Sequence, residues 1–293
     1  MAMKFHSYKP SSAGELKTPP RASKAMKMKA VVAAIALAAA LAAPLLLLHT
    51  RFPAPAAERP EPPAQQAAEI LLPLPKPKSG VVLEEALLNR RSVREWAPEP
   101  LELEDLALLL WAAQGVTEFA GWYRRTAPSA GATYPLEVYV VVGERGVRNG
   151  TSYLEAGVYK YNPLRHSLTL VARGDRRREL WEAALRQDWV RDAPASIVIC
   201  AVYERTTSRY GERGYRYVHM EAGHAGQNIY LQAAALGLGT VAVGAFDDEA
   251  LAKAIGAQPN EAPLYVFPVG VPRERYRLTF EGLRELYEAT RRG

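Results

Sequence analysis

The run Arg90-Arg91-Ser92-Val93-Arg94 places three guanidinium groups and one hydroxyl within five residues, just after a segment with helical character. Arginine offers forked N–H donors that match the oxygens of a phosphate, and serine adds a short neutral donor. We therefore interpret this run as a candidate phosphate site. A solvated basic turn on the protein surface is the alternative for a charge cluster of this kind.

The second candidate is the loop Ala127-Pro128-Ser129-Ala130-Gly131-Ala132-Thr133-Tyr134-Pro135, which leads directly into a predicted strand. Small residues allow backbone groups to lie against a flat ligand. Ser129 lacks the G-x-S-x-G setting of an acyl-transfer nucleophile, so we do not assign it that role. The loop is instead predicted to form one wall of a ligand site.

A long helix over residues 215–236 is predicted to position these groups. The segment contains no proline, is apolar over much of its surface, and has small residues that allow close packing against another backbone. Gly237 is expected to end the helix, and residues 238–246 are expected to enter a sheet. The glycines here follow a helix, whereas a dinucleotide fingerprint needs a strand first, so we reject that interpretation.

A metal site on this helix is also rejected. His219 and His224 are five residues apart, which turns the second imidazole about 140° away from the first. Zinc-binding helices instead place two histidines four residues apart on one face. We also assign Cys200, the only cysteine, to a buried strand within an apolar run, as a core residue and not a nucleophile.

The N-terminal part of the chain differs in composition from the rest. Residues 1–29 are a basic leader that accounts for the formal net charge of +6, so the remainder carries no net charge and nucleic-acid binding is not expected. Residues 30–48 are uncharged and apolar, long enough for a membrane anchor with the following protein outside the cytoplasm. A cleaved signal peptide, giving a secreted protein, is the alternative. Residues 49–79 are a linker rich in proline and alanine.

Residues 80–293 form the predicted folded domain, which is the size of one compact unit. Their periodicity predicts helices over 81–89, 103–114 and 175–187. It predicts strands over 136–142, 157–161, 167–171, 195–203 and 264–269. Because helices and strands interleave without a regular repeat, the fold class is α+β.

Four segments in this order resemble the FMN flavoproteins of the nitroreductase family, and among them the SagB-type dehydrogenases. The segments are RRSVR, PSAGATYPLEVYVV, the stretch from Arg209 to Asp248, and PLYVFPVG. The resemblance implies a central mixed sheet flanked by helices and a homodimer with FMN at the subunit interface. It covers nearly all of the predicted domain.

The resemblance also implies roles for individual residues. Arg90, Arg91 and Ser92 match the phosphate-binding run, and Arg94 matches the basic residue that reaches the flavin. Pro128, Ser129, Ala130 and Gly131 match the loop against the isoalloxazine ring, and Gly244 and Ala245 match the backbone beside its reactive nitrogen. Many relatives have an acidic residue where Gly244 stands. Arg273 is the candidate C-terminal partner of the phosphate, and Arg275 is the alternative.

The predicted activity is therefore transfer of hydride or electrons between FMN and a small organic substrate, with NAD(P)H or a quinone as the electron partner. Azoline-oxidising relatives use a Lys-Tyr pair where this chain has Arg209-Tyr210. Arginine is a poor base, so Tyr210 is the candidate acid–base group. Oxidation of a peptide azoline and a flavin-binding module without catalysis are the alternatives.

Overall fold

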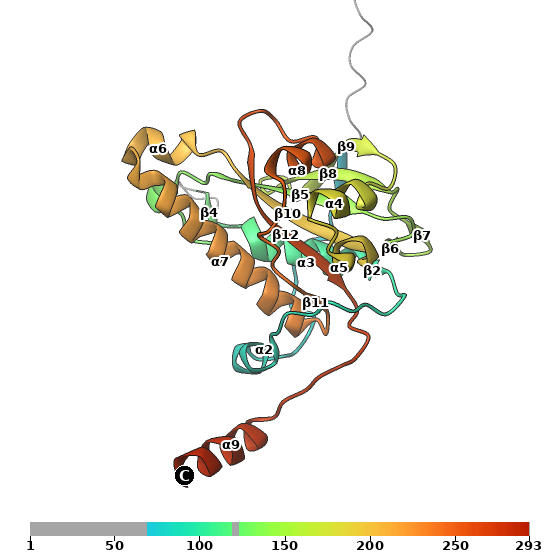
Figure 1. The fold of residues 1–293 in the computed structure, drawn as a ribbon, viewed down its shortest axis with the longest axis vertical. Helices are drawn as coiled ribbons and strands as arrows, with labels where there is room; N and C mark the ends of the chain where they lie inside the picture. Colours follow the sequence, from blue (N-terminus) through green and yellow to red (C-terminus); the bar gives the residue numbers. More distant parts are fainter. Residues whose placement is uncertain (1–68, 119–122, 293) are drawn as a thin grey trace, which may run out of the picture. The chain divides into compact units, whose positions relative to one another are not determined.

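The computed structural model describes residues 69–118 and 123–292, whose path is drawn in Figure 1. Its helices are α2 (Leu83–Asn89), α3 (Leu103–Gln114), α4 (Arg177–Ala183), α5 (Asp188–Asp192), α6 (Glu204–Tyr210), α7 (Arg213–Ala235), α8 (Asp248–Ile255) and α9 (Phe280–Arg292), with a 3-10 turn, η1 (Ala130–Ala132). Its strands are β1 (Glu69–Leu71), β2 (Leu101–Glu102), β3 (Val116–Glu118), β4 (Arg124–Arg125), β5 (Leu136–Val142), β6 (Val147–Asn149), β7 (Ser152–Tyr153), β8 (Gly157–Asn162), β9 (Ser167–Arg173), β10 (Ala195–Ala201), β11 (Gly239–Thr240) and β12 (Ala262–Gly270).

Seven strands form the main sheet, in the order β1-β9-β8-β5-β10-β12-β11, and all neighbours in it are antiparallel. The chain leaves β5 at Val142 and returns beside it at Ala195, and it leaves β10 at Ala201 and returns at Ala262. Because each excursion begins and ends at the same end of the sheet, the neighbouring strands must run in opposite directions. The prediction of a mixed sheet is wrong for these strands. A parallel pair, β2 with β6, occurs in a separate small sheet.

Helices cover both faces of the main sheet, so most residues of its central strands β5 and β10 are apolar and buried. Val138 of β5 and Ile197 of β10 belong to one buried cluster, whose helical side comes from α3 and α7. Val141 and Val198 point the other way, into a second cluster completed by α4, α5 and α8. The α+β prediction is confirmed, and the sheet is a central layer with α7 along one face (Figure 1).

Most predicted elements appear at their predicted places. α3 and β5 have the predicted bounds, and Gly237, at φ 70°, ends α7. The predicted helix over 175–187 is represented only by the shorter α4, because Leu185 and Arg186 turn the chain at positive φ before α5 begins at Asp188. Residues 238–246 contribute only the two residues of β11 and a bridge at Val243, since the Ala242 amide donates to the Tyr230 hydroxyl instead of to a strand.

Part of the predicted linker belongs to the main sheet. β1 lies within residues 49–79 and pairs with β9, with Ile70 opposite Leu168. The basic leader over 1–29 and the apolar segment over 30–48 lie outside the described residues. No helix in the described ranges is long and apolar enough to span a bilayer. The membrane anchor over 30–48 therefore stays a prediction.

Close packing of α7 on the sheet gives a prediction. A Cβ at Gly226 would lie 2.7 Å from the Phe267 ring, whereas one at Gly223 would have no neighbour within 4 Å. We expect Gly226→Ala to lower the free energy of unfolding by about 1–2 kcal/mol, since the clash outweighs the gain in helix propensity. Gly223→Ala on the same helix should raise it by about 0.5–1 kcal/mol. Urea denaturation of both variants measures the two changes. Equal changes in the free energy of unfolding would contradict the close contact of Gly226 with Phe267.

Candidate functional site

The basic run lies where the chain leaves α2 and passes alongside β11. Ser92 forms a parallel bridge with Thr240, and the Val93 amide donates to the Thr240 carbonyl oxygen at 2.9 Å. The hydroxyls of Ser92 and Tyr230 share a hydrogen bond of 2.9 Å, and the Arg90 guanidinium lies over the Tyr230 ring, 5.1 Å from its centroid. The run is thus fixed to the C-terminal half of α7 while Ser92 stays exposed.

A cavity of about 390 Å³ opens beside this run. It is lined by three arginines, Arg91, Arg275 and Arg277, and also by Glu85 and Glu274. The segment that carries the two C-terminal arginines is held to α2, since Asn89 accepts from the Leu278 amide at 2.7 Å and donates to its carbonyl oxygen at 3.3 Å. Guanidinium groups from two distant parts of the chain therefore converge on one cavity.

Tyr276, on the same C-terminal segment, lies against the basic run. The Arg91 guanidinium is stacked on the Tyr276 ring at 3.0 Å from the centroid, and both residues line the cavity. Stacking leaves the edge N–H groups of the guanidinium available to an anion. The donor set at this cavity fits a phosphate group.

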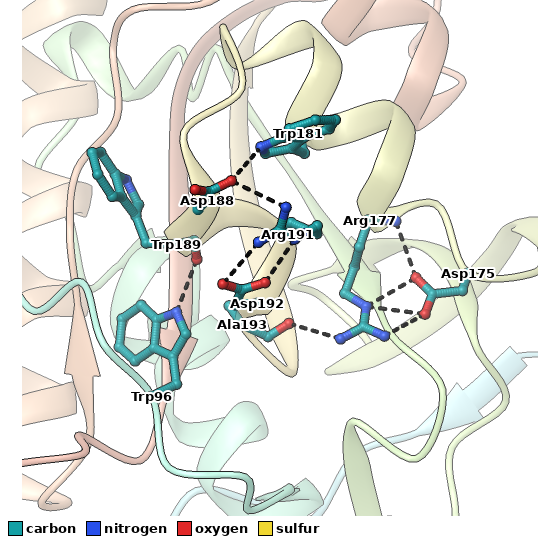
Figure 2. Close-up of polar contacts among 9 residues, drawn as sticks. All are labelled: Trp96, Asp175, Arg177, Trp181, Asp188, Trp189, Arg191, Asp192 and Ala193. Carbon is teal, nitrogen blue, oxygen red and sulfur yellow. Dashed lines mark hydrogen bonds and ion pairs between the residues drawn. The ribbon is translucent and has the colours of Figure 1, made fainter.

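Arg273 and Arg94 lie outside this cavity. The Arg273 guanidinium pairs with Glu95 at 3.2 Å, with both side chains exposed. Arg94 lies over the Trp189 ring of α5 at 5.3 Å from its centroid. The segment that follows the basic run is connected to α5, because Trp96 donates from Nε1 to the Trp189 carbonyl oxygen at 2.9 Å (Figure 2).

Residues 240–245 connect the neighbourhood of the basic run to that of α5. The Ala242 amide donates to the Tyr230 hydroxyl at 2.8 Å, Val243 forms a bridge with Val266, and the Ala245 carbonyl oxygen accepts from Gln187 at 2.9 Å. Gly244 is exposed. An extended stretch rises about 3.3 Å per residue, so Gly244 lies roughly 13 Å along the chain from Thr240. This separation is compatible with a phosphate at one end and a flavin ring at the other.

The Pro128–Gly131 loop lies elsewhere, against α6 and the first half of α7. The Gly131 carbonyl oxygen accepts from Arg209 at 3.1 Å, and a Cβ at Gly131 would lie 2.6 Å from the Tyr210 hydroxyl. The Tyr210 ring also meets that of Tyr217 edge-on, with centroids 5.2 Å apart. The structure thus brings the loop and Tyr210 together.

The Pro128–Gly131 loop and Tyr210 lie far from the basic run of the same chain. Tyr210 precedes α7, while the basic run contacts Tyr230 near its other end, seventeen residues after Arg213. At 1.5 Å per residue these two levels are roughly 25 Å apart along the helix. Figure 1 shows the same arrangement, with α6 at one end of α7 and α2 with β11 at the other.

Glu221 lies on the buried face of α7, beneath the loop. Its side chain is near Ser129, Gln114 and Arg125, and its residue is only 3% exposed. Burial raises the pKa of the Glu221 carboxyl to about 7, although polar interactions with Ser129 and Gln114 and the charge of Arg125 oppose the shift.

His219 and His224 are exposed on α7, and the described residues contain no cluster of metal-ligating side chains.

Comparison with known proteins identifies the family of this chain. The model of the Nitroreductase family matches residues 87–271, which include the basic run, the Pro128–Gly131 loop and the 240–245 stretch. This chain belongs to the nitroreductase family. The α+β fold described above is therefore a nitroreductase-like fold.

Three relatives illustrate this nitroreductase-family membership. The nitroreductase-like protein MJ1384 of Methanocaldococcus jannaschii is 50% identical over 190 residues, covering 65% of this chain and 91% of that protein. Microcin B17-processing protein McbC of Escherichia coli is 33% identical over 151 residues, covering 50% of this chain and 54% of McbC. A nitroreductase-like crystal structure from Ralstonia eutropha JMP134 has a TM-score of 0.60 at 32% identity, covering 70% of this chain and 90% of that chain. The predicted resemblance, including its SagB-type branch, is confirmed.

Several residues of the candidate site are not predicted by the sequence. Arg277 follows the predicted Arg273 by four residues, and no pattern shows which arginine of that segment reaches the cavity. The sequence pattern places Tyr230 only in a buried helix, although its hydroxyl joins Ser92 to Ala242. Gln187 was placed inside a helix. The sequence does not mark Glu221, because its burial depends on which side of α7 faces the loop.

Proposed function

We propose that this nitroreductase-family oxidoreductase is an FMN enzyme whose phosphate site is the arginine-lined cavity. Members of the family typically bind FMN. Arg91 and Arg277 supply guanidinium groups at the cavity, and the exposed Ser92 hydroxyl is hydrogen-bonded to Tyr230, which also lines it. From there residues 240–245 lead to the exposed backbone of Gly244, where the ring is expected. This cradle is the observation that carries the proposal.

We further propose a homodimer in which the partner subunit completes each site. Within one chain, the loop and Tyr210 are too far along α7 to meet a flavin bound at the basic run. In a symmetric dimer each subunit contributes both halves, one to its own site and one to its partner's. The Pro128–Gly131 loop and Tyr210 would then face the ring held by the other subunit.

Each residue in this arrangement has a physical role. Bound flavin supplies the hydride and electron chemistry, while the protein positions it and adjusts its electrostatics. The Gly244–Ala245 backbone is held in place by the bond from Gln187, so a peptide N–H can be aimed at the ring. Tyr210 is half-buried and near the loop, which places an acid–base hydroxyl where substrate would stack.

For the substrate, we propose a small organic acceptor, with NAD(P)H or a quinone as the electron partner. The second candidate is a peptide azoline, which is favoured by the similarity to McbC, a microcin-processing protein. Against it, Arg209 donates to the Gly131 carbonyl oxygen as a cation, so it does not supply a base beside Tyr210.

An absorbance spectrum of the purified protein, before and after anaerobic addition of NADH or NADPH, tests the function. A flavin spectrum that bleaches supports the reductase. A flavin spectrum that stays oxidised excludes NAD(P)H as the electron partner and leaves a quinone partner, the oxidation of a peptide heterocycle or a flavin-binding module without catalysis. Protein that is colourless and cannot be reloaded with FMN would rule out the proposal.

Two arginines in the C-terminal segment provide a matched test of the phosphate site. Arg277 lines the cavity, whereas Arg273 pairs with Glu95 at the surface. We expect Arg277→Ala to weaken FMN binding by roughly 10- to 100-fold, the value of one lost charge-assisted contact. Arg273→Ala should change the dissociation constant by less than about twofold, because exposed ion pairs contribute little. Fluorescence titration with FMN measures both. A larger loss for Arg273→Ala would place the phosphate elsewhere.

A further inference from the structure

The loop expected to face the flavin has a strained backbone. Gly131, Ala132 and Tyr134 have φ values of 61°, 53° and 45°. Positive φ is readily available to glycine but is unfavourable for alanine and tyrosine, whose Cβ atoms crowd the backbone. Two such residues so close together persist only where neighbouring groups hold them. The contacts of this turn therefore show what fixes it.

On its outer side, the turn is held by α6. Arg205 donates to the Tyr134 carbonyl oxygen at 3.0 Å, and the hydroxyls of Thr133 and Thr206 are 2.7 Å apart. Within the turn, the Ser129 hydroxyl accepts from the Tyr134 amide at 2.9 Å. This last bond closes the strained segment on itself, so its geometry depends on where the Ser129 hydroxyl points.

On its inner side, the turn rests on a buried polar group. Glu221 and Gln114 are 3% and 1% exposed, and the Glu221 carboxyl interacts with Ser129. A serine hydroxyl has one proton, so Ser129 can direct it toward the nearby Glu221 while a lone pair accepts from the Tyr134 amide. Among the described residues, Glu221 Oε1, Gln114 Nε2 and Arg125 Nε have no hydrogen-bond partner. A carboxyl in such surroundings is not explained by core packing.

We propose that Glu221 is a positioning residue of the flavin-facing loop, which acts through Ser129 to hold the strained turn in the shape that meets the ring. The role toward flavin rests on the proposed function. The role toward the turn does not, because every contact lies within the described residues of one chain.

The charged groups around Glu221 belong to several elements. Arg125 of β4 faces it, and Glu137 of β5, Arg205 of α6 and Tyr134 interact with Arg125 in turn. Tyr161 of β8 lies near Arg125 as well. Since burial raises the pKa of Glu221 to about 7, both of its protonation states are populated near neutral pH. The hold on Ser129 should therefore strengthen as pH rises through about 7, because a carboxylate is the stronger acceptor.

Amide hydrogen exchange over residues 129–134 of the full chain tests the proposal without using flavin. We expect Glu221→Ala to speed exchange at Tyr134 by roughly 3- to 10-fold, the effect of weakening one hydrogen bond. Glu221→Gln keeps an acceptor oxygen and should stay within about twofold of the wild type at pH 7. Glu212→Ala, at the exposed start of α7, is the control and should change nothing. Unchanged exchange in Glu221→Ala would overturn the proposal.

Ser129→Ala provides a second test that does not disturb the core. It should speed exchange at Tyr134 at least as much as Glu221→Ala does, because it removes the acceptor itself, and adding Glu221→Ala to it should have little further effect. If Glu221→Ala unfolds, the comparison of wild type with Glu221→Gln from pH 6 to 8 decides. Protection at Tyr134, corrected for intrinsic exchange, should rise with pH only in the wild type, and parallel profiles would contradict the role. Failure of wild-type protein to bind FMN would refute the proposed function while leaving these results interpretable.

Discussion

A heterodimer with Arg91→Ala and Arg277→Ala in one subunit and Pro128→Asp in the other is expected to bind about half as much FMN as the wild type, because a symmetric dimer has two equivalent sites. The double arginine variant removes two charge-assisted contacts, which weakens binding by roughly 10²- to 10⁴-fold. Pro128→Asp places a carboxylate on an exposed loop position expected to meet the ring. Each variant homodimer should therefore be nearly free of flavin.

The FMN binding expected of the heterodimer follows from the separation of the basic run and the loop along α7. If each site combines the basic run of one subunit with the loop of the other, the two defects in the heterodimer fall on the same site. The remaining site is then intact. Purification with two different tags isolates the mixed dimer, and the flavin-to-protein absorbance ratio gives its occupancy.

The same experiment distinguishes a site built within one chain. In that case each subunit of the heterodimer carries its own defect, and the mixed dimer should bind as little FMN as either homodimer. A wild-type pair carrying the same two tags controls for effects of the tags. An occupancy near zero for the mixed dimer would exclude the shared site.

The sequence predicts those parts of the fold that depend on local pattern. α3, β5 and the end of α7 at Gly237 appear where periodicity and glycine place them. The strand directions of the main sheet could not be predicted this way, because they depend on where long excursions return. Nor could the break between α4 and α5, since neither Leu185 nor Arg186 is a residue that signals positive φ.

The candidate site shows the same division. The basic run and the small-residue loop are contiguous in sequence, so residue types alone mark them as candidates. Their separation by much of the length of α7 is a property of packing, and so is the choice of Arg277 over Arg273 at the cavity. The burial of Glu221 also could not be predicted from the sequence, because an acidic residue on a helix usually faces solvent.

Glu221 is expected to make the stability of this protein fall with pH. Its folded-state pKa is about 7, above the ordinary value of 4.5, so the folded protein holds a proton that the unfolded chain releases between these values. The contribution is fully present below about pH 4.5 and is lost as pH rises through 7. The shift corresponds to about 3 kcal/mol in the free energy of unfolding.

Glu221→Gln removes this titration, so the difference in unfolding free energy between variant and wild type should grow by about 3 kcal/mol from pH 4.5 to pH 8. Comparing two pH values cancels any constant cost of burying the amide. Urea denaturation of flavin-free protein measures it, with Glu212→Gln on the exposed start of α7 as the control. A difference that does not change with pH would mean that Glu221 has an ordinary pKa in the folded state. A stability cost of this size at neutral pH is expected where a carboxylate is kept for positioning, because such groups are retained at functional sites despite their cost to the fold.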